Sequence, residues 1–254
     1  MRTSVPPANA VTRLGVWSAL VTAGSTIAFT AAAILTETRL LPPPWDAVLP
    51  LAPSLLLAPS FLAMLVCANA VVPRDRRIWT QLGVAFALVY VPLCSAAYIV
   101  ELFVVVPRVL RGAGEETALL TIVRSDSVFN AIDGLGYIFM SLATFVAAPA
   151  FGGSRLERWI RWLFVAHGAV ALPIFLTYFV SRTFIYGAAL WSVTLTASAV
   201  LMTVFFRRVA HTLDSDRPDD SARPKPRPSK AIEGEPARHG AMTMGTRATS
   251  SPRG

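Results

Sequence analysis

Five polar residues lie inside a stretch, Phe129–Phe151, that is apolar and long enough to cross a lipid bilayer. They are Asn130, Asp133, Tyr137, Ser141 and Thr144. Their spacing of three or four residues predicts that all five share one side of a helix. A carboxylate at the centre of such a segment costs roughly 2.5–3.5 kcal/mol, so we expect a bundle interior or a wet cavity to compensate for it.

Only two acidic residues, Glu101 and Asp133, fall within apolar runs. At ~1.5 Å per helical residue, both are predicted ~6–8 Å beneath the outer interface. Other polar residues near that level, which complete the candidate cluster, are Tyr98, Asn130, Tyr137, Tyr178 and Arg182. One interpretation is a structural network in which an acid pairs with Arg182. Another is a wet vestibule where a carboxylate binds a cation or cycles a proton, and a third is that the acids only reach the interface.

His167 is the histidine that falls inside an apolar run, and it is a candidate proton relay or a hydrogen-bonded packing residue. One such histidine cannot supply bis-histidine haem ligation. The two cysteines, Cys67 and Cys94, also lie in apolar runs without CxxC spacing, so we expect packing roles, no metal site and no cofactor.

Intramembrane protease motifs are incomplete. Ser141 lacks the glycines of a GxSG nucleophile turn, and Asp133 has no second intramembrane aspartate as an aspartyl protease requires. The pair Glu115-Glu116 is not followed by arginine at the EExxxR spacing, and no phosphate-binding glycine loop with Lys-Ser/Thr occurs. The sequence therefore favours a function other than catalysis.

The composition predicts an all-α protein, a membrane-embedded bundle. Of its 254 residues, 54% are hydrophobic and 15% charged, against about 25% charged in soluble domains. The net charge of +8 comes from short basic clusters between apolar runs. That distribution suits membrane topology and excludes a nucleic-acid-binding stripe.

Six transmembrane helices are expected, within a domain covering residues 13–208. The predicted spans are 14–35, 47–72, 80–106, 129–151, 159–180 and 184–206. Residues 1–12 form a polar lead, and residues 209–254 are predicted to be a disordered tail because they lack apolar periodicity. Pro53, Pro59, Pro92 and Pro173 are candidate kink positions, the first two in a span that either bends or begins late.

The arginines predict the orientation, because cytoplasmic loops carry an excess of positive charge. Short basic segments occur before the first span, between the second and third, between the fourth and fifth, and after the sixth. Both termini are therefore expected in the cytoplasm, in a multi-pass protein of a bacterial cytoplasmic membrane.

The segment IDGLGYIFMSLATFVAAPAF, followed by RWIRWLF, resembles a pattern found in uncharacterised bacterial polytopic membrane proteins. The resemblance covers residues 132–166 and implies an integral membrane protein, with no site residues carried over. The leading functional hypothesis is a non-enzymatic accessory, sensing or scaffold component. The alternative is a small cation- or proton-coupled transporter using the outer-leaflet carboxylates. The bilayer is the expected partner, with a protein partner or a homo-oligomer as further alternatives.

Overall fold

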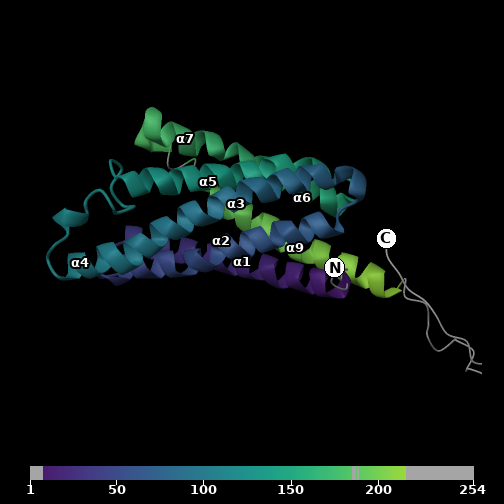
Figure 1. The fold of residues 1–254 in the computed structure, drawn as a ribbon, viewed down its shortest axis with the longest axis horizontal. Helices are drawn as coiled ribbons and strands as arrows, with labels where there is room; N and C mark the ends of the chain where they lie inside the picture. Colours follow the sequence, from purple (N-terminus) through teal and green to yellow (C-terminus); the bar gives the residue numbers. More distant parts are fainter. Residues whose placement is uncertain (1–7, 185–186, 188, 216–254) are drawn as a thin grey trace, which may run out of the picture. The chain divides into compact units, whose positions relative to one another are not determined.

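A computed structural model describes residues 8–184, 187 and 189–215, and over these ranges the chain is helical, without strands. Six helices are long and apolar enough to cross a membrane (Figure 1). They cover Asn9–Glu37, Trp45–Val71, Arg74–Leu110, Val128–Ala150, Arg155–Tyr178 and Leu190–Leu213. The expected all-α class and the number of long apolar helices are thus confirmed for the described residues.

The first, second and last of these helices are single elements, whereas the others are composite. They are α1 (Ala8–Glu37), α2 (Trp45–Val71) and α9 (Leu190–Ser215). In the third, α3 (Arg77–Val100) continues through a π-helical turn (Glu101–Val105) into α4 (Val106–Leu110). The fourth is α5 (Val128–Ala147) with a short 3-10 turn, and the fifth is α6 (Arg155–Ala169) followed by α7 (Ala171–Phe179). Helix α1 packs against α2 and α9, α3 against α2 and α5, and α5 also against α6 and α7.

The connections define two ends of the bundle. We call one the loop end; it carries segments 38–44, 111–127 and 180–184. The other, the arginine end, carries the first turn of α1, segments 72–76 and 151–154, and the last turns of α9 (Figure 1). Helix α9 begins at Leu190, later than the expected 184, and runs to Ser215, into the segment predicted as tail. The rest of that predicted tail, 216–254, lies outside the described residues.

The prolines of α2 do not interrupt it. The helix begins at Trp45 and runs through Pro50, Pro53 and Pro59, so it does not begin late as one alternative for this span required. Pro50 lacks the N–H that would reach the carbonyl of Asp46, and the hydroxyl of Thr36 donates to that carbonyl instead, at 3.0 Å. By contrast, Pro173 lies three residues after Val170, where α6 gives way to α7.

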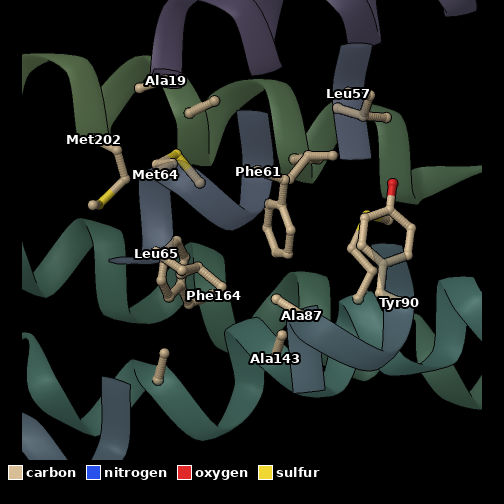
Figure 2. Close-up of a cluster of buried hydrophobic side chains, with 14 of the residues drawn as sticks. Ala19, Leu57, Phe61, Met64, Leu65, Ala87, Tyr90, Ala143, Phe164 and Met202 are labelled. Carbon is tan, nitrogen blue, oxygen red and sulfur yellow. The ribbon is translucent and has the colours of Figure 1, made fainter. Parts of the chain in front are cut away.

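The core is a continuous cluster of apolar side chains contributed by all the long helices. Figure 2 shows part of it, with Phe61 of α2 beside Tyr90 of α3 in an edge-to-face contact at 5.8 Å between ring centroids. Large apolar side chains also cover the outside of the bundle, for example Trp17 at 64% exposure and Phe103 at 72%. An apolar exterior of this kind is expected where lipid, rather than water, is the solvent.

Glycines and alanines set how closely the helices approach. A Cβ added to Gly83 of α3 would lie 2.8 Å from the carbonyl oxygen of Ala143 in α5, and one added to Gly15 would lie 2.7 Å from the Phe206 ring. At Gly136 of α5, the added Cβ would overlap Sγ of Cys94 in α3. Small residues at helix contacts are the main way that helices associate in lipid.

We therefore expect Gly136→Ala to lower stability by about 1–3 kcal/mol, because the α3–α5 contact has no room for a methyl group. The measurement is thermal unfolding of the detergent-solubilised protein. Gly24→Ala is the matched control, since no atom lies within 4 Å of its added Cβ, and it should be neutral or stabilising by about 0.5–1 kcal/mol. Removing the thiol with Cys94→Ala should restore stability to the Gly136→Ala variant. If the double variant is no more stable than Gly136→Ala, this account of the contact is wrong.

Candidate functional site

A cavity of about 220 Å³ lies towards the loop end of the bundle. It is lined by residues from α1, α2, α3, α5, α7, α9 and the 111–127 loop. The lining residues are Phe29, Leu51, Tyr98, Ile122, Asn130, Asp133, Gly134, Tyr137, Ile174, Thr177, Tyr178 and Trp191. Five members of the candidate cluster, Tyr98, Asn130, Asp133, Tyr137 and Tyr178, therefore meet around one space. We call it the Asp133 cavity.

The start of α5 places its share of the lining. Ser127 is the N-cap residue, and its side-chain oxygen accepts the backbone N–H of Asn130 at 3.0 Å. From this point, helical spacing puts Asn130, Asp133 and Tyr137 on the cavity side, while Ser141 and Thr144 continue the same face into the fully buried core. The side-chain N–H of Asn130 donates to the carbonyl of Ile122 at 2.6 Å and so joins α5 to the loop.

The three tyrosines use their hydroxyl groups within the protein. The hydroxyls of Tyr98 and Tyr137 are hydrogen-bonded to each other at 2.8 Å, which links α3 to α5. The hydroxyl of Tyr178 in α7 donates to the carbonyl of Asn130 at 2.8 Å. This contact needs a glycine, because a Cβ on Gly134 would overlap the Tyr178 hydroxyl. The tyrosines thus contribute mainly their rings to the cavity wall.

Two further aromatic residues complete the wall. The Trp191 ring lies between Tyr137 and Phe29, at centroid distances of 5.0 and 5.3 Å, tilted by 53° in each case. These separations fall in the range of favourable aromatic pairs. Neither Trp191 nor Phe29 was among the candidate residues, although Ser25 and Thr26 lie four and three residues before Phe29 in α1.

Asp133 is the acidic residue of this cavity. Its Oδ1 atom is buried and has no hydrogen-bond partner among the described residues. The ion pairs of the described residues are Asp75–Arg76, Arg108–Glu116 and Arg124–Asp126, and none of them reaches Asp133. The side chain of Arg182 lies outside the described part of the structure, so the proposed pairing of an acid with Arg182 stays a prediction.

Glu101 does not share the cavity with Asp133. Its side chain, only 3% exposed, accepts hydrogen bonds from the Thr121 hydroxyl and from the Ile122 backbone N–H, both at 2.9 Å. It also lines a separate cavity of about 270 Å³ between the start of α2, α4 and the loop. The two acids therefore line separate cavities and have different hydrogen-bond surroundings.

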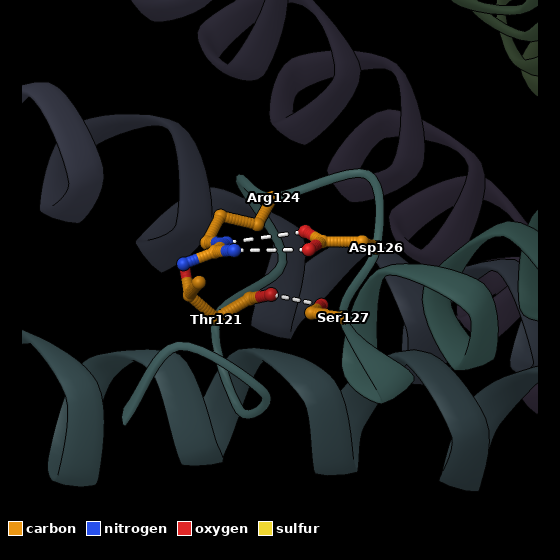
Figure 3. Close-up of polar contacts among 4 residues, drawn as sticks. All are labelled: Thr121, Arg124, Asp126 and Ser127. Carbon is orange, nitrogen blue, oxygen red and sulfur yellow. Dashed lines mark hydrogen bonds and ion pairs between the residues drawn. The ribbon is translucent and has the colours of Figure 1, made fainter. Parts of the chain in front are cut away.

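The loop that bonds to Glu101 is itself held by several contacts. The hydroxyl of Ser127 donates to the carbonyl of Thr121, and two nitrogens of Arg124 bond to the Asp126 carboxylate at 3.1 and 2.9 Å (Figure 3). Hydrogen bonding within this exposed pair raises the pKa of Arg124 and lowers the pKa of Asp126. The loop is thus ordered between its two anchors, Glu101 and the N-terminus of α5.

His167 is fully buried and lies away from the Asp133 cavity. Its Nδ1 is 2.9 Å from the Thr194 hydroxyl, which is also placed to donate to the carbonyl of Leu190 at 2.9 Å. This geometry fits a histidine that carries its proton on Nδ1 and donates it to Thr194. Nε2 has no partner among the described residues, and the predicted proton relay remains a prediction.

Comparisons with known protein families, curated proteins and solved structures find no match. The resemblance of residues 132–166 to bacterial polytopic membrane proteins stays a prediction. Among the described residues, no group of three or more His, Cys, Asp or Glu could hold a metal ion.

The hydrogen bonds of Glu101 predict a structural role. Glu101→Ala leaves the Thr121 hydroxyl and the Ile122 N–H without their acceptor, which should cost about 1–3 kcal/mol in a thermal or chemical unfolding measurement. In Glu101→Gln, the side-chain amide can still accept from the Ile122 N–H and donate to the Thr121 hydroxyl, so the loss of stability should be smaller. Thr121→Val should lower the free energy of unfolding of the Glu101→Ala variant by less than it lowers that of the wild type. Additive losses of stability would mean that the two residues are not coupled.

Proposed function

We propose that the chain is a multi-pass protein of a bacterial cytoplasmic membrane, with both termini on the cytoplasmic side. Nine arginines lie at the arginine end of the bundle. They are Arg13, Arg74, Arg76, Arg77, Arg155, Arg158, Arg161, Arg207 and Arg208. The loop end has Arg39, Arg108, Arg111, Arg124 and Arg182. The excess supports placing the arginine end in the cytoplasm, with the loop end on the opposite side.

We further propose that the protein is a non-enzymatic sensing or accessory component that binds a small ligand in the Asp133 cavity. The observation that carries this proposal is Asp133, which lines a cavity built from six helices and a loop and whose Oδ1 atom is buried without a hydrogen-bond partner among the described residues. A buried acceptor left without a partner costs free energy, so its retention suits a ligand that supplies the partner.

Cation- or proton-coupled transport is the second candidate, and the same Asp133 carboxylate favours it. The version that uses both acids loses its support, because Glu101 is engaged by Thr121 and Ile122. Transport by Asp133 also needs a route to the arginine end. Along α5, that direction is occupied by fully buried side chains, including Met140, Thr144 and Ala147. This packing favours binding from one side over transport.

Accessibility of introduced cysteines tests the cavity. In a background with Cys67→Ala and Cys94→Ala, Thr177→Cys should react with a small, membrane-impermeant methanethiosulfonate reagent added at the loop end. Thr144→Cys is the control, because Thr144 lies on the polar face of α5 but is fully buried. Labelling of Thr177→Cys from both sides of the membrane would favour transport, and no labelling from either side would refute an accessible site.

The same background tests the orientation. Ser125→Cys in the loop and Asp75→Cys between α2 and α3 are exposed positions at opposite ends of the bundle. In intact cells, an impermeant maleimide should label Ser125→Cys only, and disruption of the membrane should add labelling of Asp75→Cys. The reverse pattern would invert the proposed topology.

A further inference from the structure

The charge of the Asp133 cavity is unbalanced. Its lining contains one carboxylate and no lysine, arginine or histidine among the described residues. The carboxylate oxygen Oδ1 is buried and has no hydrogen-bond partner there. A cation would balance the charge of an ionised Asp133, whereas a neutral or anionic ligand would leave that charge uncompensated or require Asp133 to hold a proton. The lining therefore selects for positive charge.

The rest of the wall selects the kind of cation. Five of the twelve lining residues are aromatic: Phe29, Tyr98, Tyr137, Tyr178 and Trp191. Their rings attract cations electrostatically, and cages of such rings are used to recognise quaternary ammonium groups. For a metal ion the described residues offer less, because no group of three or more His, Cys, Asp or Glu among them could hold one.

The hydrogen-bonding groups of the cavity wall further restrict the class of cation that could bind. The hydroxyls of Tyr98 and Tyr137 bond to each other, and the hydroxyl of Tyr178 bonds to the carbonyl of Asn130. The Asn130 side chain donates to Ile122, and the Thr177 hydroxyl donates to Pro173. Few polar groups remain to replace the water around a primary ammonium ion. An alkylated ammonium, which has few or no N–H groups, loses less on entering such a site.

The volume limits the ligand to a small one. About 220 Å³ is below the roughly 300–1,000 Å³ of pockets that hold drug-sized molecules, and it equals the liquid volume of about seven waters. A trimethylammonium group with a short substituent is in this size range, whereas a long lipid or a peptide is not.

We infer that the Asp133 cavity binds a small alkylated ammonium ion, with Asp133 opposite its charge and the rings of Tyr98, Tyr137, Tyr178 and Trp191 around it. This inference rests on the proposed function, since it specifies the ligand class of the same site. It makes Asp133 a binding residue and leaves Glu101 outside the site, as an anchor of the loop.

The test uses the full chain in detergent or nanodiscs, with choline and tetramethylammonium as probes. Both should raise the melting temperature in a saturable way, whereas 3,3-dimethylbutan-1-ol, the neutral carbon analogue of choline, should not. Asp133→Asn should weaken binding of both cations by about tenfold or more, and Trp191→Leu by more than Trp191→Phe. Glu116→Gln is the matched control, because this exposed carboxylate lies at the same end of the bundle but outside the cavity lining, so choline binding should persist.

Charge selectivity gives a readout that does not depend on equilibrium binding. With Thr177→Cys in the cysteine-free background, a trimethylammonium methanethiosulfonate should react faster than its sulfonate counterpart, relative to their rates at the exposed Ser125→Cys. Adding Asp133→Asn should remove that preference. Unfolding of a variant is recognised separately, because the Ser125→Cys reference and the melting curve report it.

The outcomes separate the two proposals. If choline and its neutral analogue stabilise the protein equally, or Asp133→Asn leaves the charge preference unchanged, the ammonium class is wrong while a small-ligand cavity survives. If Thr177→Cys is inaccessible to every reagent and no probe shifts the melting curve, both the ligand class and the proposed function are overturned.

Discussion

The backbone of Ile122 connects the elements at the loop end of the bundle. The N–H of Ile122 donates to the Glu101 carboxylate, and the C=O of Ile122 accepts from the Asn130 side chain. One residue of a connecting loop is therefore tied to α3 on one side and to α5 on the other. Because Ile122 also lines the Asp133 cavity, these two bonds fix the cavity wall where no helix provides it. A loop in this position would otherwise have backbone groups without partners.

Glu101 and Asp133, the two acids within the long apolar helices, illustrate how the surroundings of a carboxylate differ from one helix to the next. Glu101 begins a π-helical turn, in which the N–H of Val106 bonds to the carbonyl of Glu101 five residues earlier. The turn precedes Pro107, which has no N–H to continue the helical ladder. There the carboxylate meets two donors from the loop. Asp133 lies in the regular part of α5, where its backbone is already bonded and Oδ1 finds no donor among the described residues.

Much of the fold follows from local sequence patterns, and part of the site follows with it. Apolar length predicts the six helices, and spacing of three and four residues places Asn130, Asp133 and Tyr137 on one face. Depth along a helix does not give the direction in which a side chain points relative to other helices, so the sequence left open whether Glu101 and Asp133 meet. The hydrogen-bond donors to Glu101 come from a loop without apolar periodicity. Phe29 reaches the cavity because α1 packs on α9. The sequence does not indicate either contact, because each joins segments that are far apart in the chain.

The hydrogen bonds between the helices are the basis of the selectivity that we propose for the cavity. A wall of tyrosines and an asparagine would ordinarily present many donors and acceptors to a ligand, and would accept polar molecules of several kinds. Here those groups are used to hold α3, α5, α7 and the loop together, and Gly134 permits the Tyr178 hydroxyl to reach the backbone. What remains for a ligand is aromatic surface and one carboxylate oxygen. Structural hydrogen bonds between the helices thus restrict which chemistry the cavity can recognise.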